Sequence, residues 1–385
     1  MKEYNITDFG AVGNGNSDCT AAIQKALDTA GERTEGGAVL VPPGIYQTGP
    51  LRIPSHVALR GIPSWGYKTV GGSILRWRGK ETANDKALLD ITGSVGCRIS
   101  GLCLEGSGSQ GEIHGISFAR QDFFDHPEED AFIVEDCQIH GFSGCGLFLQ
   151  YACCFSVRHC HIFENASDGV YINSWDGFFL DNQISSNMGW GVHCASMGVN
   201  NSAFTFTGNR IEWNRKGGIY LRHSRLWNIT GNCFDRSGGP AIYIDRSLSR
   251  EEVGDNRWVP LPCQAITITG NVFNRSGADF FDNLAQEDSC HIRMCECFGV
   301  TVTGNTFLLG QDDVIGEGKY SPKHGVIFEK LKGCVIADNA LWKACLEEPV
   351  LWPLDEVDSN VIIQGNVGCP VPKQDLESGH FSWEN

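Results

Sequence analysis

The chain has 385 residues, with 30 Lys and Arg against 46 Asp and Glu, for a formal net charge of -16. This balance repels nucleic acid and anionic membrane surfaces at long range, so neither is expected as a partner. Forty-seven glycines and only 20% charged residues favour a turn-rich, strand-rich protein over a helical bundle or a disordered chain.

Targeting signals and cysteines point to a cytoplasmic protein. The first residues, MKEYNITDFGAVG, hold no basic stretch followed by an apolar one, so no signal peptide is expected, although a secreted chain trimmed of its signal would look the same. The 17 scattered cysteines are interpreted mostly as reduced, buried thiols. No run of about 18 apolar residues predicts a membrane-spanning helix.

A helix is predicted at about residues 17–31, in NSDCTAAIQKALDTAGE. Ser17 or Asp18 would serve as its N-cap, and Ala22, Ile23 and Leu27 would share one face. At the end of a solenoid such a helix would cover the open core of the first coil. The stretch that follows, GGAVLVPPGIYQTGPLRIPSHVALRG, predicts strands between Pro and Gly turns.

A repeat dominates the rest of the chain. It reads apolar, two residues, Asn or Cys, one residue, apolar, as in AITITGNVF and VTVTGNTF. The segments alternate with period two, which indicates strands rather than helices. A repeat unit with a minimum length of about 22 residues cannot bury its apolar face by itself, so the units must stack into a parallel β-solenoid. The Asn or Cys positions are Cys137, Cys160, Asn182, Asn209, Asn232, Asn271, Asn305, Asn339 and Asn366.

The repeated Asn is interpreted as scaffold. An Asn in the left-handed conformation at a turn would hydrogen-bond to its equivalent one coil above and below, and the preceding Gly would ease the turn. The Cys-rich stretch CHIRMCEC suits a metal site less well than alternating burial, so no metal and no cofactor are expected.

The stretches ITDFGAVGNGNSDCTAAIQKALD and GGAVLVPPGIYQTGPLRIPSHVALRG resemble the N-terminal region of the pectate-lyase-like right-handed parallel β-helix superfamily. The resemblance implies an all-β, single-stranded right-handed parallel β-helix over residues 1–370 with an N-terminal capping helix, followed by a polar tail at 371–385. Members mostly act on carbohydrates, so an oligosaccharide or polysaccharide partner is implied, and a homodimer or homotrimer is compatible with the family.

Two subfamilies of this superfamily have motifs that can be compared with the chain. The N-T-D, D-D, G-H-G and R-I-K motifs of polygalacturonase-type hydrolases do not occur in the matching setting. The late coils, CHIRMCECFGVTVTGNTF and SPKHGVIFEKLKGCVIADNAL, loosely resemble the β-helical fructotransferases and difructose anhydride hydrolases.

In this architecture the first strand of each coil begins shortly after the ladder turn, as in GVYIN, GVHCA, GIYLR and AIYID. Alternation predicts that Val170, Ile172, Val192, Cys194, Ile219, Leu221, Ile242 and Ile244 face the core. The outward stripe would offer aromatic faces and fixed polar groups to a sugar, although an ordinary solvated β face is the alternative. The predicted substrate-binding residues are Tyr171, Asn173, His193, Tyr220, Arg222, Tyr243, Arg293 and Glu329 on the stripe, flanked by Trp190, Trp213, Asp168 and Asp176.

Glu212 and Asp235 occupy the same offset after their ladder Asn, so they are predicted to stack, while Asp245 projects from the stripe. Glycoside hydrolysis needs one protonated and one ionised carboxyl group, which makes Asp245 with Asp235 or Glu212 the predicted catalytic set of a glycoside hydrolase or glycosyl-transferring enzyme. A lyase that eliminates across a uronate is the runner-up, with base and cation drawn from His193, Tyr220, Arg222 and Arg293. A non-catalytic glycan-binding or tailspike-like module is the alternative from another class.

Overall fold

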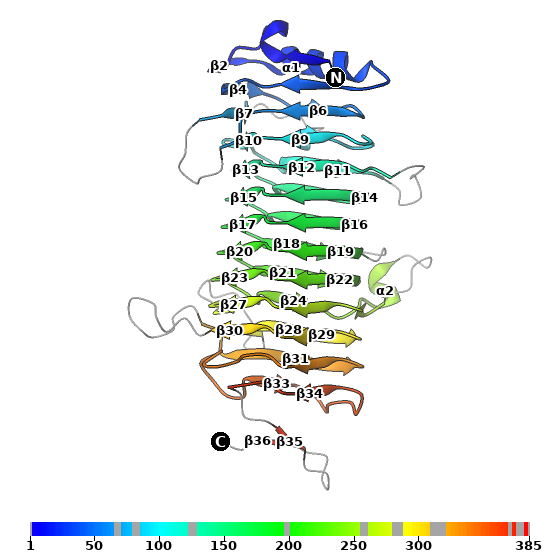
Figure 1. The fold of residues 1–385 in the computed structure, drawn as a ribbon, viewed down its shortest axis with the longest axis vertical. Coiled ribbons are helices and arrows are strands. Elements are labelled where there is room, and N and C mark those ends of the chain that lie inside the picture. The colour runs from blue at the N-terminus through cyan, green and yellow to red at the C-terminus, as the bar shows by residue number, and fades with distance from the viewer. Residues whose placement is uncertain are drawn as a thin grey trace. The chain divides into compact units, whose positions relative to one another are not determined.

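The computed structural model describes residues 2–64, 71–78, 85–121, 129–195, 201–254, 261–278, 288–308, 321–368, 372–374 and 381–383. The chain divides into two compact units, Met1–Thr205 and Phe206–Asn385. Each unit is built from stacked coils of short parallel strands (Figure 1). A single domain over 1–370 stays a prediction.

Each coil of the first unit has a longer and a shorter face. The strands of the longer face pair in parallel with those of the next coil. The longer face holds β1 (Glu3–Asn5), β3 (Gly37–Leu40), β5 (Leu51–Arg52), β6 (Val57–Arg60), β8 (Ala87–Asp90), β9 (Arg98–Ser100), β11 (His114–Ala119), β12 (Ile133–Glu135), β14 (Leu147–Arg158), β16 (Val170–Leu180), β18 (Trp190–Ala195) and β19 (Asn201–Thr207). The other face holds β2 (Asn14–Asp18), β4 (Gly44–Thr48), β7 (Ser73–Trp77), β10 (Leu102–Glu105), β13 (Gln138–His140), β15 (His161–Phe163) and β17 (Gln183–Ser185).

The second unit repeats this plan. Its longer face holds β21 (Gly217–Arg222), β22 (Ser224–Thr230), β24 (Ile242–Ile244), β25 (Cys263–Gln264), β26 (Thr267–Thr269), β28 (Cys290–Phe298), β29 (Thr301–Thr303), β31 (His324–Lys332), β32 (Val335–Ala337), β33 (Leu351–Pro353) and β34 (Ile362–Gln364). The other face holds β20 (Arg210–Glu212), β23 (Cys233–Asp235), β27 (Val272–Asn274) and β30 (Thr306–Leu308). A four-residue helix, α2 (Arg250–Val253), follows β24.

Alternation along the strands builds the core of each unit. The residues predicted to face inward are all 0% exposed: Val170, Ile172, Val192 and Cys194 in the first unit, and Ile219, Leu221, Ile242 and Ile244 in the second. In register, Val170 lies beside Val192, and Ile219 beside Ile242. Like side chains therefore stack from coil to coil, and the period-two pattern is confirmed as the source of the core.

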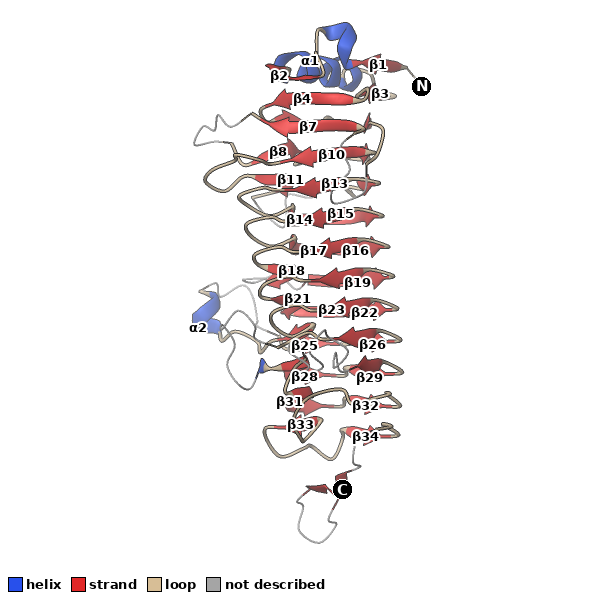
Figure 2. Cartoon of the chain, turned by 90° about the vertical axis from the view of Figure 1, so that its left-hand side faces the viewer, coloured by secondary structure: helices blue, strands red, loops and turns tan. Residues whose placement is uncertain are grey.

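The predicted cap helix is present as α1 (Thr20–Gly31), at the N-terminal end of the first unit (Figure 2). It begins later than predicted because Ser17 and Asp18 belong to β2. The Asp18 carboxylate still accepts hydrogen bonds from the backbone N–H of Thr20 at 3.0 Å and from its hydroxyl at 2.6 Å. Ile23, Ala26, Leu27 and Ala30 are buried against the first coils, so the capping role is confirmed.

The asparagines form the predicted ladder. In the second unit Asn271 Oδ1 accepts from Asn232 N at 2.9 Å and from Asn232 Nδ2 at 3.0 Å. Asn271 N and Nδ2 in turn donate to Asn305 Oδ1, each at 3.0 Å. In the first unit Cys160 occupies a ladder position: its backbone N–H donates to Asn182 Oδ1 at 2.9 Å, and its thiol lies 3.7 Å from the Val134 carbonyl oxygen of the preceding coil. Each Asn therefore satisfies buried backbone and amide groups in two coils.

The predicted left-handed conformation of the ladder Asn is wrong. The left-handed residue is the one before it, with φ of +66° at Gly270 and +63° at Gly304. Asp181 and Asp338 take the same place with φ of +55° and +56°. The turn thus tolerates Gly, which has no Cβ, or a short polar residue whose side chain can hydrogen-bond locally.

Gly304→Ala should destabilise the protein by about 1–2 kcal/mol, because an L-residue pays for a left-handed φ. A Cβ at this position would meet no heavy atom within 4 Å, so the cost is purely conformational. Gly304→Asn should cost less. Urea unfolding of the two variants tests this, and equal stability of Gly304→Ala and the parent protein would contradict it.

The structure also bears on the predictions about the cysteines, the C-terminal tail and membrane-spanning helices. The cysteines in the described ranges form no disulfide, and most are buried, including Cys290, Cys295 and Cys297 of CHIRMCEC. Within the tail, β35 (Pro372–Gln374) and β36 (Phe381–Trp383) pair antiparallel. Among the described residues no helix is both long enough and apolar enough to cross a membrane.

Candidate functional site

An aromatic row runs across the outward side of the first unit. Phe148, Tyr171 and His193 are register neighbours on β14, β16 and β18. The Phe148 and Tyr171 rings stack with centroids 4.8 Å apart and planes 8° apart, and His193 meets Tyr171 edge-on at 5.6 Å and 85°. His114 extends the row by stacking on Phe148 at 4.6 Å. Such a row offers a continuous aromatic surface to the apolar C–H patches of a sugar.

His193 is oriented by Asp168. The Nδ1 atom of His193 lies 2.7 Å from Asp168 Oδ2, and the side chains of His193 and Asp168 are 25% and 9% exposed. A carboxylate only accepts hydrogen bonds, so Nδ1 carries the proton and Nε2 carries the lone pair when the ring is neutral. A histidine held in this tautomer by a carboxylate is equipped to act as a general base.

The backbone around this pair explains why Asp168 is so well held. Its Oδ1 accepts from the backbone N–H of Trp190 at 2.7 Å. A Cβ on Gly189 would come within 2.1 Å of Asp168 Oδ1, and a Cβ on Gly169 would meet the Gly191 carbonyl at 2.7 Å. Glycine at these two positions therefore lets the carboxylate and the next coil approach closely. The Trp190 side chain, predicted to flank the stripe, is half-buried.

Tyr171 and Asn173 complete this cluster on β16. Burial raises the pKa of Tyr171 to about 12, so its phenol keeps its proton at neutral pH. Asn173 is 7% exposed, and its Oδ1 atom accepts no hydrogen bond from the part of the chain that the structure describes. A buried acceptor of this kind marks a position where a ligand hydroxyl would be satisfied. Asp176, predicted as a flanking residue, lies farther along β16 beside Cys153, with Oδ2 and Sγ 3.8 Å apart.

In the second unit the Asp245 carboxylate accepts hydrogen bonds from several neighbouring residues. It accepts from the Tyr220 hydroxyl and from Arg222, whose Nε lies 3.0 Å from Asp245 Oδ2, and from Arg246 N at 2.8 Å. Burial and the Asp245 charge raise the pKa of Tyr220. The Tyr243 ring meets Tyr220 edge-on at 5.6 Å. The predicted neighbours Tyr220, Arg222, Tyr243 and Asp245 are thus together, but Asp245 is part of an ion pair.

Arg293 is less open than the predicted stripe requires. It is 5% exposed and forms an ion pair with Glu329, while its Nε lies 3.4 Å from Asp288 Oδ1. Burial alone would raise the pKa of Glu329, but the bond to Arg293 lowers it below its usual value. The buried Arg293 and the partly exposed Glu329, two predicted binding residues, therefore neutralise each other's charge.

Glu212 and Asp235 are register partners on β20 and β23, as their equal offset from the ladder predicted. Both are buried. Asp235 accepts from Arg275 Nε and from Asn274 Nδ2, each at 3.1 Å, and forms an ion pair with Arg236. Burial raises the pKa of Asp235 to about 6, against the opposing charge of Arg275.

Trp213, a predicted flanking residue, lies near this acid pair, whereas the contacts seen among the described residues do not join Asp245 to Asp235. The Arg236 guanidinium stacks over the Trp213 ring at 5.2 Å, and Arg210 Nε donates to Glu212 at 2.8 Å. Asp235 ends β23 and Asp245 follows β24, and the contacts seen among the described residues do not join the two acids.

Sequence reasoning missed the arginines that hold Asp235. Arg236 and Arg275 both have left-handed backbones, with φ of +49° and +52°, directly after β23 and β27. This is a second recurring left-handed position of the coil, at a fixed offset from the ladder turn. The repeated "NRSG" and "DRSG" strings were the available signal.

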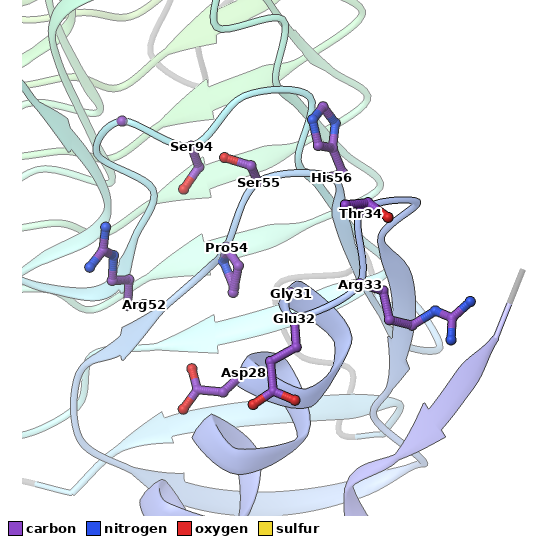
Figure 3. A pocket seen from close by; sticks show the side chains of 11 residues that line it. Asp28, Gly31, Glu32, Arg33, Thr34, Arg52, Pro54, Ser55, His56 and Ser94 are labelled. Atoms are coloured by element: carbon purple, nitrogen blue, oxygen red, sulfur yellow. The ribbon is translucent and has the colours of Figure 1, made fainter.

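A separate depression of about 640 Å³ lies in the first unit, at the C-terminal end of α1 (Figure 3). Its lining includes the charged or titratable side chains of Asp28, Arg33, Arg52 and His56. None of the residues predicted to bind substrate or to act in catalysis lines it.

Comparison with known proteins agrees with the fold. Residues 4–72 match a family model described as rhamnogalacturonase A/epimerase, pectate lyase-like, and residues 89–201 and 195–339 match the right handed beta helix region. Alginate lyase 7 of Azotobacter vinelandii is 35% identical over 108 residues, which cover 23% of this chain and 12% of that protein. Mannuronan C5-epimerase AlgE1 of the same organism is 28% identical over 208 residues, which cover 48% of this chain and 14% of that protein.

Solved structures show the same architecture. The A-module of mannuronan C-5 epimerase AlgE6 from A. vinelandii superposes with a TM-score of 0.64 at 16% identity, over 96% of this chain and all of that one (100%). DFA-IIIase from Arthrobacter chlorophenolicus A6 gives 0.59 at 14% identity, over 95% and 87% of the two chains. At such identities these likenesses concern the fold. The family-model match over most of the sequence shows that the chain belongs to the right-handed parallel β-helix family, as its N-terminal stretches implied.

Proposed function

We propose that this protein is a carbohydrate-active enzyme that removes the proton α to the carboxyl group of a uronate residue, as a lyase or an epimerase. The observation that carries the proposal is the Asp168–His193 pair, set edge-on against Tyr171 in one outward row. The curated relatives named alginate lyase and mannuronan C5-epimerase support it. Their alignments span less than a fifth of their own length, so the activity comes to this chain as a proposal.

In the proposed reaction His193 Nε2 takes the proton from the sugar carbon next to the carboxyl group. The electron pair of the broken C–H bond moves into the carboxyl group. It then either expels the glycosidic oxygen on the neighbouring carbon, which gives an unsaturated sugar, or takes up a proton on the opposite face, which gives the epimer. The protonated Tyr171 phenol is the proton donor in either branch, and Asp168 stabilises the imidazolium that forms.

The test is to incubate the protein with neutral and uronate oligosaccharides in deuterated water. We expect one of two results: deuterium at the carbon next to the carboxyl group in intact chains, from epimerisation, or ultraviolet-absorbing unsaturated ends, from elimination, which leaves that carbon without a hydrogen. New reducing ends without deuterium or unsaturation would indicate hydrolysis instead. Binding without any chemical change would favour the glycan-binding module.

Hydrolysis is a second candidate function, because the carboxyl groups of Glu212 and Asp235 lie on adjacent coils and have different hydrogen-bond partners. The pKa of Asp235, raised by burial to about 6, suits a general acid, and Glu212 would then be the base or nucleophile. Hydrolysis is the weaker candidate because the Asp235 carboxylate already accepts hydrogen bonds or ion pairs from Arg236, Arg275 and Asn274.

Asp235 also predicts a pH dependence of stability. Its pKa rises from about 3.9 in the unfolded chain to about 6 in the folded protein, so the folded state binds this proton more tightly. The stabilisation is complete below about pH 4 and is lost as the pH rises through about 6. Urea unfolding between these limits should show a steeper loss for the parent protein than for Asp235→Asn. The exposed Glu251→Gln serves as control, and parallel curves for all three proteins would contradict the prediction.

A further inference from the structure

A cluster of soft and hard ligand groups lies on β14 and β16, apart from the aromatic row. It consists of the thiols of Cys153 and Cys154 and the carboxylate of Asp176, whose ligand atoms all lie within 4.8 Å of one another. The two Sγ atoms are 3.5 Å apart, and Cys153 Sγ lies 3.8 Å from Asp176 Oδ2. Cys153 is buried, while Cys154 and Asp176 are half-buried, so the cluster is open to solvent on one side.

A backbone irregularity brings the thiols together. Successive side chains of a regular strand point to opposite faces, which would separate two adjacent cysteines. The register between β14 and β16 shifts between Gln150 and Cys153, and Cys154 has a left-handed φ of +55°. This bulge turns both sulfur atoms to the same side. Asp176, with φ of +54°, takes the place of Cys154 one coil further on, because Cys153 pairs with Trp175.

The spacing fits a tetrahedral zinc ion. Zinc binds thiolate sulfur at about 2.3 Å and carboxylate oxygen at about 2.0 Å, so tetrahedral ligands lie about 3.7 Å apart for two sulfurs and about 3.5 Å for sulfur and oxygen. The observed separations are 3.5 Å and 3.8 Å. Each differs from the ideal by only a few tenths of an ångström. A disulfide would need the two sulfurs to approach to about 2.05 Å, a much larger movement.

Neighbouring carboxylates complete the site. The Glu129 side chain hydrogen-bonds the Cys154 thiol, which places a further oxygen ligand next to the cluster. Asp130, fully buried and paired with Arg120, accepts from the backbone N–H of Cys153 at 2.8 Å and so fixes that residue. The local charge is negative, and this favours a cation.

We propose that Cys153, Cys154 and Asp176 form a binding site for a thiophilic divalent cation of the zinc class, with Glu129 as the fourth ligand. Two thiolates in the set exclude calcium and magnesium, which prefer oxygen ligands. Binding releases the protons of both thiols and ties the bulge of β14 to the next coil. This site does not depend on the proposed catalytic reaction.

The experiment titrates the reduced, chelator-stripped full chain with Co²⁺ alone and then with Zn²⁺. We expect one equivalent of Co²⁺ to produce the ultraviolet charge-transfer band of thiolate coordination, which Zn²⁺ then displaces. Cys154→Ser should abolish the band, and Asp176→Asn should weaken Co²⁺ affinity by about 10-fold or more. Cys345→Ser, which removes another half-buried thiol, should change neither.

A second readout separates binding from folding defects. Zn²⁺ should raise the thermal midpoint of the parent protein and of Cys345→Ser, but not that of Cys154→Ser, whose circular dichroism should match the parent. Absence of a stoichiometric cobalt band in the reduced parent overturns the proposal. So does a band that survives Cys154→Ser, or a Cys153–Cys154 disulfide, seen as a mass lower by two hydrogens, that persists in the reductant.

Discussion

His193→Ala should lower turnover of the glycan substrate by about 10²–10⁴-fold, the usual contribution of a positioned general base. The loss follows from the pairing of His193 Nδ1 with the nearly buried Asp168 carboxylate, which places the lone pair of the neutral ring on Nε2. Deuterium incorporation by epimerisation, or formation of unsaturated ends by elimination, should fall by the same factor, because both begin with this proton abstraction. Binding of the glycan, measured by calorimetry, should remain because the Phe148–Tyr171 stack is intact.

The chain offers a matched control for this variant. His159 forms the same kind of pair with Asp136, with Nδ1 2.6 Å from Asp136 Oδ1, but its side chain is 60% exposed and it lies at a turn of the scaffold. His159→Ala should keep the parent turnover. Asp168→Asn should lower turnover as well, since it presents an amide where the imidazole needs an acceptor. Equal turnover of His193→Ala and His159→Ala would remove His193 from the mechanism.

Asn271→Ala should be the most destabilising of the substitutions considered, by about 3 kcal/mol or more. Asn271 is 0% exposed, and its Oδ1 accepts from both the backbone and the side-chain N–H groups of Asn232. Its Nδ2 donates to Asn305 Oδ1 and to the Ile229 carbonyl, each at 3.0 Å. Each buried partner left unsatisfied costs about 1–3 kcal/mol, and alanine leaves several.

Urea unfolding measures this effect. Asn228→Ala, at an exposed position of β22, should stay within about 0.5 kcal/mol of the parent. Asn271→Cys should fall between the two, because Cys160 occupies the equivalent position in an earlier coil and its thiol lies 3.2 Å from a backbone carbonyl oxygen, that of Arg158. A loss for Asn271→Ala no larger than that for Asn228→Ala would show that the ladder contributes little to stability.

Local patterns in the chain were enough to predict the scaffold. Alternation placed Val170, Ile172 and Ile242 in the core, and the recurring Asn marked the ladder, because both depend on spacing along one strand and one turn. The same spacing brought Glu212 beside Asp235 and Tyr171 beside His193. Burial and strand register, which repeat from coil to coil, could therefore be predicted before the structure was known.

The chemistry of individual side chains depended on partners that the repeat does not encode. Asp245 was predicted as a catalytic acid, yet it pairs with Arg222 and Tyr220 from the preceding coil. Arg293 was predicted on an open face, yet Glu329 and Asp288 cover it. The Arg222–Asp245 and Arg293–Glu329 pairs join residues of adjacent coils, whose side chains meet only after the coils have stacked.

By itself, then, the sequence determined the strand period, the core, the capping helix and the membership of the right-handed β-helix family. Only the tertiary structure decided that Asp168 orients His193, that the Cys153–Cys154 bulge faces Asp176, and that Gly270 rather than Asn271 adopts the left-handed conformation. The physical reason is that burial and alternation are set by the local pattern, whereas hydrogen bonds and ion pairs are set by side-chain distances between coils.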